Sequence, residues 1–185
     1  DGFALCSMRN ENLSRYYIQC SLNGKAEDYN DAYFWQQLRN RLPNKFKENL
    51  VTGPSIEKSI APLRSFVVEP LQYGQLFLVG DAAHIVPPTG AKGLNLAFSD
   101  VYYLSDALKS FYGGQGSNEL ESYSRRALSR IWKAVRFSWW MTTLMHEFPS
   151  ADAFDRKIKL SEIDYLSNSK KAQTVFSENY VGLPL

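Results

Sequence analysis

Residues 75–95 read QLFLVGDAAHIVPPTGAKGLN, and this stretch decides how the chain folds. Its apolar start, 75–79, is typical of a buried strand, and Gly80 allows the backbone to approach a ligand closely at the carboxyl end of that strand. Two prolines stiffen the turn. Gly90 and Gly93 leave room above the first turn of a helix, whose unpaired N–H groups attract an electron-rich or anionic group. The pattern favours a site for a polar cofactor, and the alternative is a tight connection without a ligand.

The composition is that of a globular chain. Of its 185 residues, 44% are hydrophobic and 22% are charged, which is enough apolar material for a core and excludes disorder as the dominant state. The net charge of +2 predicts no nucleic-acid or membrane-surface partner. The sequence has no apolar run long enough to span a bilayer, and its two Cys and two His lack the spacing of a zinc site. We therefore expect a cytoplasmic protein with reduced thiols and no metal.

A β-hairpin is predicted at the start, from strand-like residues 2–9 and 13–22. A turn symmetric about Asn12 pairs Arg9 with Arg15 and Ser7 with Tyr17, and it places these four side chains on one face. The opposite face is predicted to join a core and contains Ala4, Cys6, Met8, Tyr16, Ile18 and Cys20.

The remaining pattern predicts an α+β fold. Strands are expected at 65–71 and 75–79 around a Tyr73-Gly74 turn, and helices at 30–42, 43–50, 93–112, 118–147 and 151–166. The predicted buried stripe of the helix at 93–112 is Leu94, Ala97, Phe98, Val101, Leu104 and Leu108. The apolar tail, 177–185, is expected to dock on another element. The basic residues and tryptophans at 125–140 indicate an amphipathic helix, with its aromatic side chains in a core or in a subunit contact.

Residues 80–100, GDAAHIVPPTGAKGLNLAFSD, resemble the second flavin-binding motif of the group A flavoprotein aromatic hydroxylases. Five further stretches resemble the members of this family that act on 4-hydroxybenzoate: 2–7, 14–17, 58–72, 130–142 and 178–184. The resemblance covers essentially the whole chain. The βαβ unit with GxGxxG that opens the family's FAD domain is not among these residues.

The resemblance implies the C-terminal part of such an enzyme, with a GR2-type FAD/NAD(P)-binding fold. It assigns residues 1–74 to the substrate-binding sheet with covering helices, 75–108 to the last FAD-domain strand, flavin motif and following helix, and 109–185 to a helical interface region. The implied reaction uses FAD, NADPH and O2 to convert 4-hydroxybenzoate to 3,4-dihydroxybenzoate through a flavin C4a-hydroperoxide. A homodimer is implied as well, and the 185-residue chain alone is expected to be inactive because it needs the N-terminal FAD domain.

The resemblance also assigns substrate roles to individual residues. Arg9 binds the benzoate carboxylate with Ser7 and Tyr17 beside it, and a guanidinium suits this task because it donates two parallel hydrogen bonds. Pro88 turns its carbonyl toward the substrate phenol. Tyr180 is one of two tyrosines that relay the phenolic proton, and its partner falls upstream of Asp1.

For FAD, the resemblance assigns six residues of the hairpin and the flavin motif: Arg15, Asp81, Gly90, Lys92, Leu94 and Asn95. Asp81 contacts the ribityl chain, and the backbone at Leu94 and Asn95 meets the pyrimidine edge of the flavin. Arg15 lies against the flavin. Lys92 and the helix N-terminus stabilise negative charge on the reduced flavin ring. The alternative interpretation of Lys92 is an exposed lysine at the start of the helix, without a ligand.

Three interpretations stay open on the sequence. In the first, the substrate is another hydroxybenzoate isomer. In the second, the chain is a non-catalytic module that binds an aromatic acid, and in the third it is a non-catalytic module that takes part in assembly. His84 is read as a structural residue or as one that supports ligand-contacting residues without touching the ligand, and Arg64 as a candidate contact for NADPH.

Overall fold

The computed structural model describes residues 2–182 and has an α+β fold. The chain divides into two compact units. Unit 1 comprises Asp1–Pro62 and Met145–Asp155, and unit 2 comprises Leu63–Leu144 and Arg156–Leu185. The three-part division expected from the family resemblance concerns functional regions, so it stays a prediction beside these units.

Unit 1 begins with the predicted hairpin, formed by β1 (Ala4–Asn10) and β2 (Leu13–Ile18). The predicted pairing is wrong, because Ser7 lies opposite Arg15 and the residue opposite Tyr17 is Leu5. The turn is tighter than expected. Asn10 pairs directly with Leu13, and the register is irregular between residues 8 and 10, so Arg9 has no cross-strand partner in it. The error is a shift of two residues, which leaves every side chain on its predicted face.

Helices cover only part of the hairpin's apolar face. Asn30 caps α1 (Asp31–Arg41) by accepting the Tyr33 N–H at 2.9 Å, as the sequence predicted, and α2 (Asn44–Lys47) follows. The ring of Tyr16 meets Trp35 of α1 edge-on, 5.2 Å between centroids. Met8 is 79% exposed, so the prediction of a fully buried face is wrong at that end of the hairpin.

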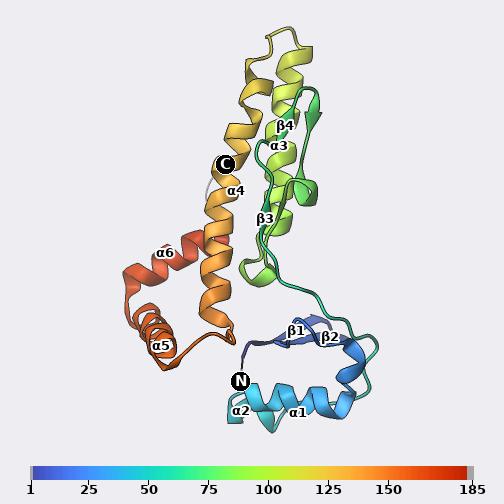
Figure 1. Cartoon of the computed structure of the whole chain (residues 1–185), viewed down its shortest axis with the longest axis vertical. Helices are drawn as coiled ribbons and strands as arrows, with labels where there is room; N and C mark the ends of the chain where they lie inside the picture. The colour runs from blue at the N-terminus through green and yellow to red at the C-terminus, as the bar shows by residue number, and fades with distance from the viewer. Residues whose placement is uncertain (1, 183–185) are drawn as a thin grey trace. The chain divides into compact units, whose positions relative to one another are not determined.

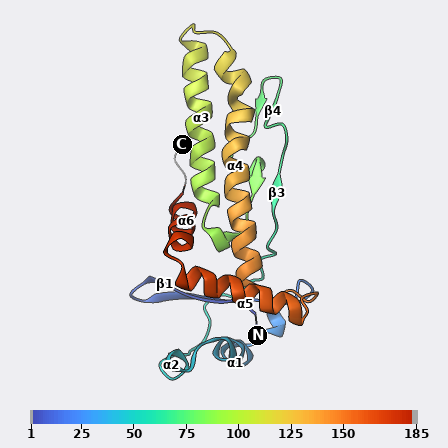
Figure 2. The ribbon, with the colours of Figure 1, turned by 90° about the vertical axis from the view of Figure 1, so that its left-hand side faces the viewer.

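The centre of unit 2 is the helix pair α3 (Gly93–Tyr112) and α4 (Asn118–Met145), which lie side by side in both ribbon views (Figures 1 and 2). Short strands pack against this pair: β3 (Phe66–Val67) pairs with β6 (His84–Ile85), and β4 (Gln72–Tyr73) pairs with β5 (Leu76–Phe77). The predicted strands at 65–71 and 75–79 are wrong in extent, since each contains only two strand residues, and Tyr73 lies in β4 and not in the turn. The buried cluster between the helix pair and the short strands contains Leu71, Ala83, Leu96, Tyr103, Tyr123, Ala127, Ile131 and Val135.

The buried face of α3 is not the predicted one. Leu94, Phe98 and Val101 of the predicted stripe are more than half exposed. The residues that α3 buries are Leu96, Ser99, Asp100, Tyr103 and Ala107. The helix carries apolar side chains around most of its circumference, and such a helix is typical of the interior of a larger domain.

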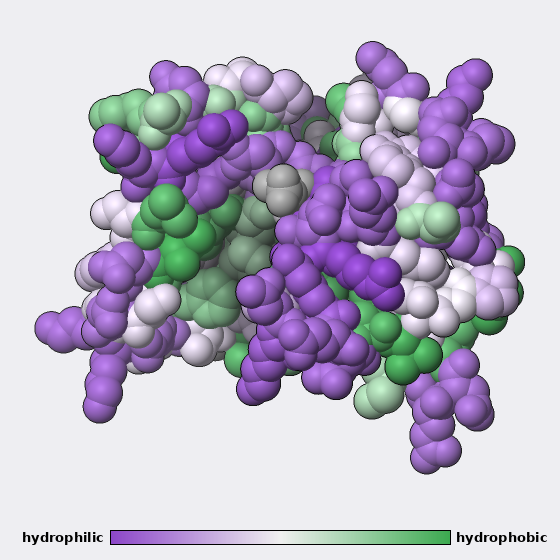
Figure 3. Space-filling model, turned by 90° about the horizontal axis from the view of Figure 1, so that it is seen from below, coloured by the Kyte–Doolittle hydropathy of each residue, from purple (hydrophilic) through white to green (hydrophobic). Residues whose placement is uncertain are grey.

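Two further helices follow α4. The predicted helix at 151–166 is α5 (Ala153–Asn168), which buries none of its residues. α6 (Lys170–Val181) was not predicted and contains residues 177–181 of the apolar tail, and Gly182 follows it as the C-cap. The rest of the tail, 183–185, lies outside the described residues. Seen from below, hydrophobic side chains gather in patches among hydrophilic ones (Figure 3). Over residues 2–182, the structure contains no helix that combines the length and apolar character of a membrane span.

Candidate functional site

The hairpin of unit 1 brings two of the predicted substrate residues, Arg9 and Tyr17, into contact and carries the third, Ser7, on the same strand as Arg9. Arg9 donates a hydrogen bond from Nη2 to the Tyr17 hydroxyl at 3.0 Å, and Ser7 faces Arg15 in the register. Partial burial raises the pKa of the Tyr17 phenol, but hydrogen bonds and charge from Arg15 and Arg9 outweigh it and hold the pKa below its ordinary value. This face therefore offers two cations and two hydroxyls to an anionic ligand.

The turn after β5 carries the first predicted cofactor residues. Gly80 has φ +59, in the left-handed region that favours glycine, and it begins a 3₁₀ turn, η2 (Gly80–Ala82). Asp81 is exposed, so its carboxylate is free to face a ligand. A second carboxylate, Asp100 of α3, is buried and accepts the Gly80 N–H at 2.9 Å. Asp100 was assigned no role from the sequence, because it lies outside the stripe of α3 that was predicted to be buried.

The proline-rich loop continues into a second 3₁₀ turn, η3 (Pro88–Gly90). Pro88 is exposed, and its carbonyl accepts the Ala91 N–H at 2.9 Å, which leaves one lone pair for a ligand. Gly90 is buried against α4, where an added Cβ would lie 2.6 Å from Ser138 Oγ. Gly90 therefore allows the loop to pack closely on α4, and its contact with the cofactor stays a prediction.

The N-terminus of α3 is open to a ligand. Lys92 stands at the N-cap position without a side-chain cap, and the first intrahelical bond runs from Leu96 N–H to Lys92 C=O. Leu94 and Asn95 in the first turn are exposed. Uncapped amides at the positive end of a 20-residue helix suit an electron-rich ring edge, so these residues fit the flavin that the motif implies.

Lys92 is only 5% exposed, which contradicts the alternative of an exposed helix-start lysine. Its Nζ donates to the Tyr180 carbonyl at 2.5 Å and lies 5.3 Å from the ring centroid of Phe137. Burial, and then the charge of Arg130, lower the pKa of this ammonium group. No carboxylate among residues 2–182 forms an ion pair with it, so Lys92 is a buried cation without a counter-ion in the described part of the chain.

Tyr180 lies on α6 and is 49% exposed. Its ring stacks on Phe176, with centroids 5.9 Å apart, and meets Phe137 edge-on. These contacts anchor α6 beside Lys92 while the phenol stays accessible. The structure thus supports an anchoring role for the Tyr180 side chain, and its role in proton transfer stays a prediction.

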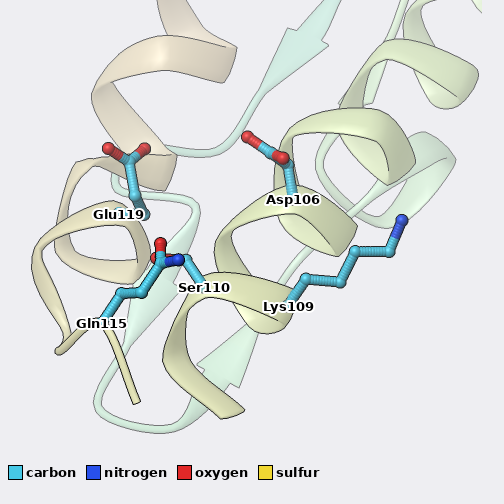
Figure 4. Close-up of a pocket in the computed structure, with 5 residues that line it drawn as sticks. All are labelled: Asp106, Lys109, Ser110, Gln115 and Glu119. Carbon is cyan, nitrogen blue, oxygen red and sulfur yellow. The ribbon is translucent and has the colours of Figure 1, made fainter. Parts of the chain in front are cut away.

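A polar pocket lies elsewhere in unit 2, at the turn between α3 and α4 (Figure 4). Its lining residues are Asp106, Lys109, Ser110, Gln115 and Glu119. Asp106 follows Gly93 by 13 positions on α3, about 20 Å along the helix at 1.5 Å per residue, so the pocket is not part of the predicted cofactor site. Residues 2–182 contain no cluster of side chains suited to a metal ion.

The predicted site residues are divided between the two units. Unit 1 contains Ser7, Arg9, Arg15 and Tyr17, and unit 2 contains Asp81, Pro88, Gly90, Lys92, Leu94, Asn95 and Tyr180. The expectation that both groups line one catalytic site stays a prediction.

The arrangement in unit 2, with a left-handed glycine after a strand and an uncapped helix N-terminus, fits the flavin-binding segment that the motif resembles. The model of the FAD binding domain family matches residues 1–138, and the chain therefore belongs to this family. It is 60% identical over 183 residues to p-hydroxybenzoate hydroxylase of Acinetobacter baylyi, which covers 99% of this chain and 45% of that protein.

Two further matches are more distant. The 6-hydroxy-3-succinoylpyridine 3-monooxygenase HspB of Pseudomonas putida is 31% identical over 90 residues, 46% of this chain and 23% of that protein. The solved structure of BexE, from work on oxidation during BE-7585A biosynthesis, matches with a TM-score of 0.67 and 16% identity over 92% of this chain and 34% of its own. The chain thus spans less than half the length of the first relative, and the structural match concerns the fold alone.

Proposed function

We propose that this chain is the C-terminal portion of an FAD-dependent monooxygenase that hydroxylates 4-hydroxybenzoate to 3,4-dihydroxybenzoate. The observation that carries the proposal is the 60% identity to p-hydroxybenzoate hydroxylase over 99% of this chain. Membership of the FAD binding domain family supports the cofactor. In finer terms, the fold is the GR2-type FAD/NAD(P)-binding fold, with the three functional regions expected at 1–74, 75–108 and 109–185.

Substrate binding belongs to the hairpin. Arg9 binds the carboxylate of the benzoate, and Ser7 and Tyr17 contribute hydroxyl donors. The bond between Arg9 Nη2 and the Tyr17 hydroxyl supports this role because it holds the guanidinium in one orientation before the substrate arrives. The lowered pKa of Tyr17 reports the same concentration of positive charge.

FAD, when bound, supplies the oxygen-transfer chemistry with O2 and with reducing equivalents from NADPH. Asp81 accepts hydrogen bonds from its ribityl hydroxyls, and the α3 N-terminus at Leu94 and Asn95 donates to its pyrimidine edge. Lys92, a buried cation without a described counter-ion, favours negative charge on the flavin ring. Arg15 lies against the flavin. Gly90 keeps the loop close to α4, and Arg64 contacts NADPH.

Proton handling at the substrate phenol belongs to Pro88 and Tyr180. The Pro88 carbonyl accepts a hydrogen bond from the phenol with its second lone pair. The Tyr180 hydroxyl takes part in moving the phenolic proton, since a phenolate is the better nucleophile. Trp132 and Trp139 of α4 are exposed, which supports a homodimer contact on this helix, and the cytoplasm is the proposed location.

The test uses a hybrid protein in which this chain replaces the matching segment of the Acinetobacter baylyi hydroxylase. We expect the purified hybrid to bind FAD, to oxidise NADPH when 4-hydroxybenzoate is added, and to form 3,4-dihydroxybenzoate. A preference for another hydroxybenzoate isomer would refute the para assignment. A hybrid that folds and binds the acid without oxidising NADPH would favour the non-catalytic binding module.

A further inference from the structure

A buried carboxylate holds the turn that the proposed function gives to FAD. Asp100 of α3 is 1% exposed, and a charge so deeply buried requires hydrogen-bond partners. Its Oδ2 accepts the Gly80 N–H at 2.9 Å and lies 2.7 Å from His84 Nε2. Both partners are buried as well, so these bonds are shielded from water.

The chemistry of the three groups fixes the direction of each bond. The Gly80 amide can only donate and an ionised carboxylate can only accept, so His84 donates from Nε2. Nδ1 of His84 is buried and has no hydrogen-bond partner in the part of the chain that the structure describes. In the tautomer that carries its proton on Nδ1, that N–H would have no acceptor, so the tautomer protonated on Nε2 is favoured. Asp100 is the sole hydrogen-bond partner of this ring among residues 2–182.

A second side chain holds the same segment one step upstream. Tyr123 of α4 donates its hydroxyl to the Leu78 carbonyl at 2.7 Å. Burial, and then the negative charge of Asp100, raise the pKa of Tyr123, so this hydroxyl keeps its proton. The backbone that enters the turn is thus bound by α4 at Leu78 and by α3 at Gly80.

We propose that Asp100 is a positioning residue for the cofactor-binding turn. Its carboxylate holds Gly80 in the left-handed conformation, at φ +59, and it holds His84 on the far side of the turn. The exposed Asp81 between them is thereby presented to the ribityl chain in one orientation. Asp100 itself does not touch FAD. This inference rests on the proposed function, because that function makes Asp81 a ligand of FAD.

The first test uses the 185-residue chain without cofactor. Asp100→Asn keeps the shape, but its amide group faces two donors with only one acceptor oxygen. We expect the Gly80 amide to exchange its hydrogen at least about tenfold faster, the effect of losing a hydrogen bond to a charged group. The matched control, Asp106→Asn, changes an exposed carboxylate on the same helix and leaves this exchange unchanged. Unaltered Gly80 exchange in Asp100→Asn overturns the proposal.

A second measurement needs no variant and covers the case in which Asp100→Asn does not fold. The nitrogen chemical shifts of His84 in the unaltered chain report which ring atom carries a proton. We expect Nε2 to be protonated. A bare Nε2 overturns the proposal, because the carboxylate then has no donor in the ring.

The third measurement addresses the cofactor and uses the hybrid described above. In Asp100→Asn we expect the FAD dissociation constant to rise about tenfold, while KM for 4-hydroxybenzoate and kcat at saturating FAD stay within about twofold. An unaltered dissociation constant overturns the positioning role. If the unaltered hybrid binds no FAD, the proposed function falls and the cofactor role of Asp100 falls with it, whereas the exchange result still decides whether Asp100 holds Gly80.

Discussion

Replacing Gly90 with alanine tests how closely the proline-rich loop packs on α4. The added Cβ would lie 2.6 Å from Ser138 Oγ, 3.2 Å from Ser138 Cα and 3.3 Å from Ser138 Cβ. Ordinary contacts of this kind lie near 3.5–4.0 Å. Ser138 is fully buried in the C-terminal third of α4, so neither side can move without disturbing the core.

The expected cost follows from overpacking. Inserting one methyl group into a well-packed core costs about 1–3 kcal/mol, and a contact of 2.6 Å belongs in the upper half of that range. For a chain of 185 residues, about 2 kcal/mol corresponds to a fall of roughly 4–8 °C in the unfolding midpoint. The hydroxyl of Ser138 has no hydrogen-bond partner in the described structure, so Ser138→Ala alone is expected to cost less than about 1 kcal/mol.

The assay is thermal unfolding of the 185-residue chain, followed by circular dichroism. Gly90→Ala should lower the midpoint by the amount given above. Gly53→Ala is the matched control, since nothing lies within 4 Å of its added Cβ, and it should change the midpoint little. The double variant Gly90→Ala/Ser138→Ala should recover part of the loss, because the contact at 2.6 Å is removed. Equal midpoints for the two glycine variants, or no recovery in the double variant, would refute this account.

Four further outcomes are expected. In the hybrid, Arg9→Lys should weaken 4-hydroxybenzoate binding at least about tenfold, since lysine cannot bind a carboxylate with two parallel hydrogen bonds. A flavin fluorescence titration measures this affinity, and the FAD content should be unchanged. Equal affinity would show that Arg9 does not bind the carboxylate. The 185-residue chain alone should not retain stoichiometric FAD through gel filtration, and a yellow protein peak would contradict this. Phe98 is 66% exposed, so Phe98→Ser should reduce binding of an apolar dye without lowering the unfolding midpoint. The pKa of Lys92 is lowered in the folded state, so just below pH 10.5 the unfolded chain holds more protons than the folded chain, and the free energy of unfolding should rise with pH there. Urea titrations at several pH values should show this rise in the unaltered chain, and the contribution of this site should be absent in Lys92→Met.

The local signals in the sequence were sufficient for most elements of the fold. Asn30 capped the helix that its position predicted, and the helical patterns beginning at Gly93 and Asn118 became α3 and α4. The hairpin was also predicted, but its register was not, because the pattern of alternation is identical after a shift of two residues. Only the tight connection from Asn10 to Leu13 decides between these registers.

Tertiary packing explains what the sequence could not predict. α3 is apolar on two sides, and the choice of Leu96 and Tyr103 over Leu94 and Phe98 for burial depends on where α4 lies. Asp100 was overlooked for a related reason. A charged residue counts against a buried face unless its partners are known, and those partners, Gly80 and His84, lie 20 and 16 residues away along the chain.

The segment that leads to the cofactor turn is organised by side chains of helices more than by a sheet. Each strand in it has two residues, yet its backbone is bound at three points: Ser124 accepts the Leu71 N–H, Tyr123 donates to the Leu78 carbonyl, and Asp100 accepts the Gly80 N–H. Helix side chains thus do here what neighbouring strands do in an extended sheet. We therefore expect these bonds to α3 and α4 to order the turn without the help of a cofactor. Since a ligand that meets an ordered site spends less of its binding energy on ordering it, we expect FAD affinity in the complete flavoprotein to depend on residues of α3 and α4 that never touch the cofactor.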